Sequence, residues 1–258
     1  MIETNHYQAL VGGYGTAVVA WLVAGRLLPR LWPAKGHPPF TRPWVEIGFL
    51  APALAVIILF GVLYGTGVQL PARGPFGPML ETLNHLIIFS PLLLLLFLRR
   101  HALSTAWLPT DRIAARLGLG AAMAILALAA FSLIRAGADP IWQALPRLAR
   151  YAYLPHFVQV FLEDAAIAML FVRLGALIRR PWLLAPIVGA LFAAAHAPAL
   201  LAQGLGPREM GYLLADFLLA AGIIFVLQRS RDVLWFFPVH FVMDMSQYSA
   251  ISGVAAAG

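Results

Sequence analysis

The sequence contains no cysteine and few charged residues. Without cysteine the chain can form no disulfide, has no thiol nucleophile and cannot hold zinc through thiolates. Only 11% of its 258 residues are charged, whereas a soluble domain carries about 25%. The hydrophobic fraction is 61% and the mean hydropathy is +0.82. These values are typical of an integral membrane protein, and they predict that residues 1–258 form a single integral-membrane domain.

Basic residues are in excess, with a formal net charge of +7. They lie mostly in short clusters between apolar runs, a distribution that sets the orientation of membrane helices. We therefore expect the chain to be surrounded by the lipid bilayer and to have no nucleic-acid partner. Thirteen of the 18 lysines and arginines fall in alternate loops. By the positive-inside rule these loops are cytoplasmic and both termini lie outside. Because arginine far outnumbers lysine, we expect a multi-pass protein of a bacterial cytoplasmic (inner) membrane.

Eight apolar segments are long enough to cross a bilayer, which takes about 20 residues. Proline and glycine mark most of the joints between them. The sequence therefore predicts an all-α fold, a polytopic membrane helix bundle of about eight transmembrane helices. The expected spans are Gln8–Leu28, Trp44–Tyr64, Leu80–Leu98, Ile113–Ile134, Pro155–Leu177, Trp182–Ala202, Glu209–Gln228 and Val233–Ala250.

The segment Asp139–Tyr153, between the fourth and fifth spans, has apolar residues at intervals of three and four. Its tyrosines, tryptophan and basic residues suit a membrane interface, so we expect a short helix lying on the outer surface. An ordinary amphipathic connector is the alternative. Elsewhere, Gly12 with Thr16 and Gly189 with Ala193 have the spacing that allows helices to approach closely.

Three of the expected spans carry ionisable residues near mid-membrane. The fifth span contains the adjacent acids Glu163 and Asp164, the sixth contains His196, and the eighth contains His240 and Asp244. A charge in hydrocarbon costs at least about 2.5 kcal/mol, so such residues are functional candidates by default. His240 and Asp244 are four residues apart and share one helix face. Glu163 and Asp164 are adjacent and point about 100° apart, so we expect only one of them to face a reacting centre.

The predicted orientation gives these residues similar depths. With about 1.5 Å of rise per residue, Glu163, His196 and Asp244 fall in one slab in the outer half of the membrane, with His240 just below. Asp216 in the seventh span falls in the same slab and is a candidate for an additional member. We interpret the set as one polar pocket. The alternative is a group of structural hydrogen bonds between helices.

At these residues the sequence resembles the CPBP family, also called the Abi or CAAX-protease family, of intramembrane endopeptidases. The family pattern is a Glu-Glu pair with an arginine four residues later, then Phe-x-x-x-His, then His-x-x-x-Asn/Asp. Glu163-Asp164 is similar to the first element, the run ending in His196 to the second, and His240 with Asp244 to the third. The resemblance implies a catalytic core at 155–250, preceded by N-terminal transmembrane helices and the interfacial connector at 1–154.

This sequence departs from the family pattern at two positions. The second acid is Asp164 in place of glutamate, and Ala168 stands where the family has its arginine. Arg173 lies ten residues after Glu163, about 15 Å along a helix, and cannot fill that place. If the arginine orders the acid pair, another group must do so here, or activity is lost.

Hydrolysis of a peptide bond needs an activated water and a stabilised oxyanion. We expect Glu163 and His196 to hold and deprotonate the water and His240 to donate to the oxyanion. Asp244 is expected to orient His240 or, if protonated, to donate as well, and Asp164 to support the site. The resemblance implies the same roles in a glutamic-type hydrolase that needs no metal or other cofactor. The expected substrate is a membrane-anchored, lipidated or secreted protein or peptide.

Three other readings are open. Zinc could bind to the same histidines and carboxylates. A catalytically inactive scaffold of this kind could serve as an immunity or partner-binding membrane protein. The third alternative is a proton-coupled transporter, because buried acids and histidines also form proton relays. The absence of an inverted repeat from the sequence argues against it.

Overall fold

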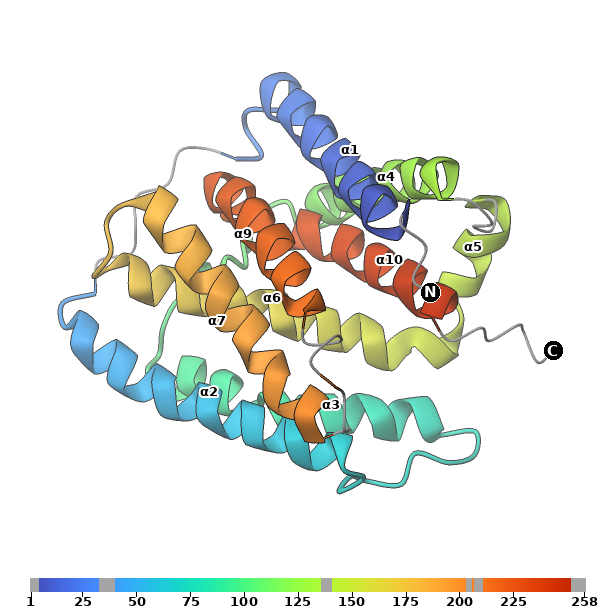
Figure 1. The fold of residues 1–258 in the computed structure, drawn as a ribbon. Coiled ribbons are helices and arrows are strands. Elements are labelled where there is room, and N and C mark those ends of the chain that lie inside the picture. The colour runs from blue at the N-terminus through green and yellow to red at the C-terminus, as the bar shows by residue number, and fades with distance from the viewer. Residues whose placement is uncertain (1–4, 33–39, 136–140, 203–205, 207–210, 252–258) are drawn as a thin grey trace. The chain divides into compact units, whose positions relative to one another are not determined.

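The computed structural model describes residues 5–32, 40–135, 141–202, 206 and 211–251, and this part of the chain is helical with no strand (Figure 1). The predicted all-α fold is confirmed. The elements are α1 (Asn5–Leu27), α2 (Pro43–Gly65), α3 (Gly77–Leu98), η1 (Leu103–Ala106), α4 (Ile113–Ile134), α5 (Ile141–Leu148), η2 (Tyr151–Tyr153), α6 (Leu154–Gly175), α7 (Pro181–Ala202), α9 (Tyr212–Ser230) and α10 (Val233–Ile251).

Six of the predicted spans are long and apolar enough to cross a membrane, namely α1, α2, α3, α4, α7 and α9. The protein is therefore a helical, multi-pass membrane protein. The two other predicted spans exist as helices. Of these, α6 carries two adjacent acids near its middle and Arg173 in its last turn, and the apolar stretch of α10 is the shorter segment Val233–Ser246. That α6 and α10 also cross the membrane stays a prediction, as does the start of the seventh span at Glu209, which lies outside the described residues.

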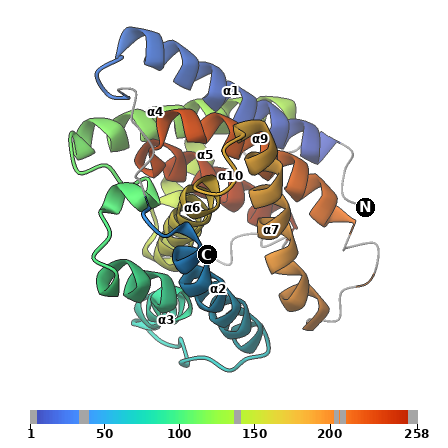
Figure 2. The same cartoon turned by 90° about the vertical axis from the view of Figure 1, so that its left-hand side faces the viewer.

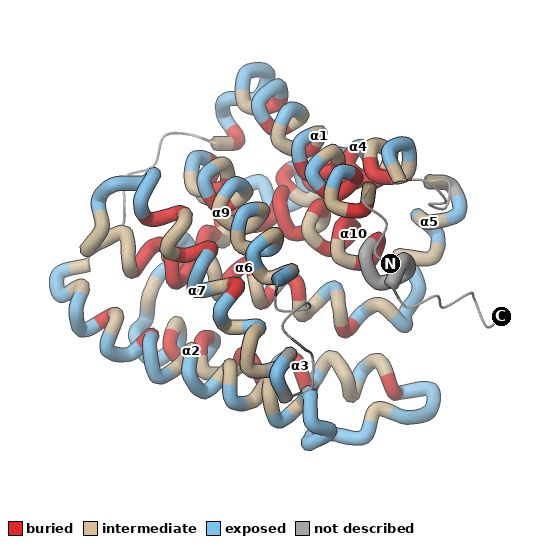
Figure 3. Tube along the Cα trace, viewed as in Figure 1, coloured by how far each residue is buried: buried red, intermediate tan, exposed pale blue. Residues whose placement is uncertain are grey.

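Much of the apolar surface is exposed, as expected of helices that face lipid. In α2 only Glu46 and Leu50 are buried, and Figure 3 shows most of this helix as exposed or intermediate. Large apolar side chains such as Phe49 and Leu59 stand on its surface. A monomeric soluble protein rarely exposes apolar patches of this extent, whereas lipid replaces water around a membrane helix.

The described chain divides into two compact units that interleave along the sequence. The first consists of Met1–Pro33, Thr110–Tyr153 and Leu234–Gly258, and holds α1, α4, α5 and nearly all of α10. The second consists of Ala34–Pro109 and Leu154–Val233, and holds α2, α3, α6, α7 and α9. A single domain with a catalytic core at 155–250 stays a prediction.

In the first unit, small residues let the helices approach closely. A Cβ atom on Gly120 of α4 would lie 2.6 Å from the carbonyl oxygen of Trp235 in α10, so only glycine fits there. Gly12 of α1 faces Ile134 at the end of α4, as its small-residue spacing predicts. The Trp21 and Trp235 rings stack with centroids 6.0 Å apart. These contacts fix α10, the helix of His240, against α1 and α4.

The segment before α6 also belongs to the first unit. The short helix predicted there is confirmed as α5, which packs against α4 and is followed by the single 3-10 turn η2. Its position on the membrane surface stays a prediction. The first two residues of the predicted segment, Asp139 and Pro140, lie outside the described residues.

In the second unit, α7 packs closely against α9, and α6 packs against α3 and α7. A Cβ atom on Gly189 would lie 2.9 Å from the backbone nitrogen of Ala221, which confirms the predicted close approach at this glycine. Proline begins two of the helices, at Pro43 in α2 and Pro181 in α7. Proline suits the first turn because the N–H that it lacks has no partner there.

Candidate active site

Glu163 lies near the middle of α6 and is half-buried. The side-chain amide of Gln159, one turn earlier, donates to Glu163 Oε1 at 2.8 Å. Asp164 is 1% exposed. The predicted divergence of the two acids is therefore confirmed, because Asp164 is buried while Glu163 keeps an accessible side.

His196 lies on α7, in the same unit as Glu163, and is exposed in the described chain. Its Nδ1 is 2.9 Å from the carbonyl oxygen of Phe192, one turn earlier. Because that oxygen can only accept, the contact assigns the ring proton to Nδ1 and leaves Nε2 as the acceptor. A neutral imidazole with an accessible Nε2 can accept a proton from water or bind a metal ion.

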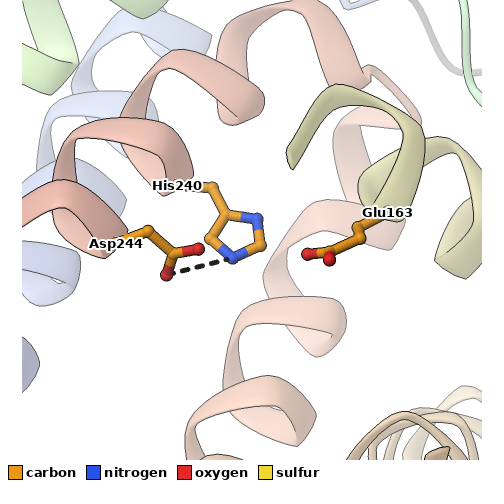
Figure 4. A group of neighbouring side chains, drawn as sticks. All are labelled: Glu163, His240 and Asp244. Carbon is orange, nitrogen blue, oxygen red and sulfur yellow. Dashed lines mark ion pairs between the residues drawn. The ribbon is translucent and has the colours of Figure 1, made fainter. Parts of the chain in front are cut away.

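His240 and Asp244 form a pair on α10, in the first unit. His240 Nε2 is 3.6 Å from Asp244 Oδ1, as the dashed line in Figure 4 marks. The side chains are 13% and 28% exposed, so the pair is partly shielded. The predicted sharing of one helix face is confirmed. Asp244 is positioned to orient the His240 ring, which also lies 5.7 Å from the Phe236 ring.

The predicted site residues thus belong to two units. Glu163, Asp164 and His196 lie in the second, and His240 with Asp244 in the first, so Figure 4 draws side chains of both. That they act in one reaction centre stays a prediction. Imidazole nitrogens and carboxylate oxygens are donors that zinc accepts, so the chemistry of the set also fits the zinc alternative.

Asp216 on α9 is exposed in the described chain and lies in the same unit as His196. An exposed carboxylate in an apolar helix requires polar surroundings. Asp216 therefore stays a candidate for an additional site residue.

The sequence interpretation missed a buried ionic network in the second unit. Arg99 Nη2 lies 2.7 Å from Glu46 Oε1, His101 Nε2 lies 3.5 Å from Glu46 Oε2, and Arg173 Nη2 lies 3.0 Å from His101 Nδ1. Arg173 Nε is also 3.9 Å from Glu46 Oε2, and Phe40 covers the Arg173 guanidinium at 5.5 Å. Arg173 is 0% exposed and so is committed to this network.

The sequence held a signal for one of the missed contacts, the hydrogen bond from Gln159 to Glu163, but none for the ionic network. The four-residue spacing between Gln159 and Glu163 predicts side chains on one helix face and could have indicated their contact. No comparable signal exists for the ionic network, because Glu46 and Arg173 are more than a hundred residues apart. Ala168, at the family's arginine position, is 0% exposed, and nothing larger is present in its place.

Comparison with models of known protein families, with curated proteins and with solved structures found no match. What the fold defines is a helical multi-pass membrane protein whose α6, α7 and α10 carry acids and histidines in their apolar sequences. The resemblance to intramembrane endopeptidases rests on the three motifs.

Proposed function

We propose that the protein is an intramembrane endopeptidase that uses a water molecule activated by Glu163 and His196. One observation carries the proposal. Each of the three main residues is held by a partner one turn away on its own helix: Glu163 by Gln159, His196 by the Phe192 carbonyl, and His240 by Asp244. Catalytic groups need fixed rotamers, and these three contacts supply them within single helices.

In the proposed reaction, Glu163 accepts a proton from water, and the resulting hydroxide attacks the carbonyl carbon of the scissile peptide bond. His240 acts as the imidazolium, with Nε2–H toward the Asp244 carboxylate and Nδ1–H donating a hydrogen bond to the oxyanion, which is the main source of stabilisation in such a step. Collapse of the tetrahedral intermediate breaks the C–N bond, and the proton taken from water passes to the leaving amine. Asp244 keeps His240 oriented, and His196 holds the water through Nε2.

The proposed substrates are membrane-anchored, lipidated or secreted proteins or peptides. The proposed location is a bacterial inner membrane with both termini outside, which follows from the distribution of basic residues. In that orientation the site opens in the outer half of the bilayer, where such substrates are tethered.

The lack of an arginine at position 168, which is occupied by alanine, favours a second candidate function. If a positive charge at this position is essential for ordering the acid pair, the protein is a catalytically inactive membrane protein that binds a partner, for example as an immunity protein.

A zinc-dependent peptidase, with zinc bound at the same residues, is the remaining alternative. Cleavage that survives chelation with EDTA, with no zinc detected in the purified protein, would separate the metal-free mechanism from the zinc-dependent one.

The proposal is tested by comparing the protein termini in membranes of cells with and without the protein. We expect new N- and C-termini, paired at single peptide bonds, in a small set of membrane-associated proteins. Identical termini in both samples, with the protein expressed and folded, would support the inactive candidate.

A further inference from the structure

The tripeptide Arg-Pro-Trp occurs twice in the second unit, each time where a helix begins. In Arg42-Pro43-Trp44 the proline is the first residue of α2, and in Arg180-Pro181-Trp182 it is the first residue of α7. The prolines are explained by their place in the first turn. The tryptophans are not explained by packing, because Trp44 is 73% exposed and Trp182 is 62% exposed.

The residues of the buried ionic network lie at helix ends close in sequence to these tripeptides. Glu46 lies one turn after Arg42, Arg99 ends α3, and Arg173 lies in the last turn of α6, shortly before α7 begins. The contacts of Glu46 with both arginines hold these ends together. Within the second unit, the start of α2 and of α7 and the ends of α3 and α6 accordingly lie on one side, which Figure 2 turns toward the viewer.

Charge on this side is not balanced. Glu46 is 4% exposed and is already engaged by Arg99 and Arg173. Four further arginines at these helix ends, Arg42, Arg100, Arg179 and Arg180, are exposed, and none of the four forms an ion pair within the described residues. Together with the two tryptophans they form a surface that we name the arginine face: Arg42, Arg100, Arg179, Arg180, Trp44 and Trp182.

We propose that the arginine face binds the phosphate headgroups of anionic phospholipids. Guanidinium groups bind phosphate oxygens through two parallel hydrogen bonds and remain charged at any physiological pH. Exposed tryptophans occupy the headgroup level of membranes, where their apolar ring and polar N–H are both accommodated. A phospholipid offers a phosphate for the arginines and, next to it, an apolar region for the tryptophan rings.

Three features favour a lipid over a free phosphate ion. A free ion would engage the arginines and leave two large aromatic side chains in water. In addition, the Arg180 guanidinium lies 6.0 Å from the centre of the Trp182 ring, so cation and ring are presented as one surface. The face also belongs to the side that the positive-inside rule assigns to the cytoplasm, where anionic lipids attract basic segments. This binding is independent of the proposed peptidase activity.

The test uses the purified full-length protein in liposomes and measures quenching of tryptophan fluorescence by brominated lipids. Brominated phosphatidylglycerol is compared with brominated phosphatidylcholine at equal total lipid. We expect the wild type to prefer phosphatidylglycerol, and the preference to disappear in a Trp44→Phe/Trp182→Phe variant, which identifies the reporting residues. In the Arg179→Gln/Arg180→Gln variant, the preference for phosphatidylglycerol over phosphatidylcholine should fall at least about fivefold, since each basic residue near an anionic surface contributes about that factor.

Arg73→Gln is the matched control, because Arg73 is exposed in the same unit but lies in the connection between α2 and α3, at the opposite ends of these helices. It should keep the wild-type preference. If the double variant fails to fold, Arg42→Gln/Arg100→Gln tests the same face. Equal quenching by both lipids in the wild type, equal loss in Arg73→Gln, or abolition of the preference by millimolar inorganic phosphate would each overturn the proposal.

Discussion

Gln159 donates its side-chain amide to Glu163 at 2.8 Å, across one turn of α6. An amide can donate to a carboxylate and, after turning over, can accept from a carboxylic acid. Gln159 therefore has a hydrogen bond to offer in both protonation states of Glu163, unlike an arginine, which only donates. This contact gives Glu163 a positioning partner in a chain that has Ala168 at the family's arginine position.

Replacing Gln159 with leucine removes that partner and leaves the Glu163 side chain without its contact. A hydrogen bond to a charged group is worth about 1.5–3 kcal/mol, so we expect the cleavage rate to fall roughly tenfold or more. The rate is measured on a substrate identified from new termini. Gln228→Leu is the control, because among the described residues the Gln228 amide donates to the Phe225 carbonyl on its own helix and to no site residue. An unchanged rate in Gln159→Leu would remove Gln159 from the mechanism.

Arg173→Leu should destabilise the second unit strongly. Arg173 is 0% exposed and contacts both Glu46 and His101, so its removal leaves a buried carboxylate with fewer partners. Breaking a buried ion pair in this way costs about 3–5 kcal/mol. Thermal unfolding in detergent should show a Tm lower by several degrees, whereas Arg179→Leu, at an exposed position, should leave it nearly unchanged. Equal Tm values for the two variants would contradict the importance of the network.

The same network makes stability depend on pH through His101. Burial lowers the pKa of His101 below 6.5, the Glu46 carboxylate opposes this, and the charges of Arg173 and Arg99 add to the lowering. Arg173 can only donate, so His101 Nδ1 must accept and the folded network requires the neutral ring. The unfolded chain therefore binds more protons than the folded chain below about pH 6.5, and stability is lost as the pH falls.

We expect the Tm of the wild type to drop between pH 7 and pH 5, and the drop to become smaller in His101→Gln. His196→Gln serves as the control, since His196 is exposed and lies outside the network, and it should keep the wild-type slope. The observation that would count against His101 is an identical slope in all three proteins.

Gly189→Ala should disturb the contact between α7 and α9. The added Cβ atom would meet the backbone of Ala221 at 2.9 Å, and backbone atoms cannot move aside as a flexible side chain can. Overpacking of this kind costs about 1–3 kcal/mol. Gly222→Ala provides the matched control on α9, because a Cβ atom there has no neighbour within 4 Å. Thermal unfolding should rank Gly189→Ala below the wild type and Gly222→Ala at or above it.

The helices could be predicted from the sequence because a membrane imposes a simple length and composition on them. The span predicted at Ile113–Ile134 matches α4 to the residue, and Pro181 marks the start of α7. The division into two units could not be predicted. It depends on contacts between segments distant in sequence, such as the approach of Gly120 to Trp235, which leave no periodic signal in either segment.

The candidate site could be predicted in part. Contacts within one helix follow from the spacing of residues, so the pairing of His240 with Asp244 could be predicted from the sequence. The positions of Glu163 and His240 relative to each other depend on packing across the chain, which spacing alone does not determine. The distance of Arg173 from Glu163 correctly excluded it from the family's arginine position. Its actual partners, Glu46 and His101, could not be predicted from the sequence.

The most direct test of the account is the cleavage activity of Glu163→Gln. The amide keeps the size of the side chain and can still hydrogen-bond to Gln159, but it cannot take a proton from water. Using a substrate defined by the new termini, and the Tm to confirm that the variant is folded, we predict that cleavage falls by at least about a hundredfold. Full activity in the folded variant would contradict Glu163 as the base and, with it, the proposed mechanism.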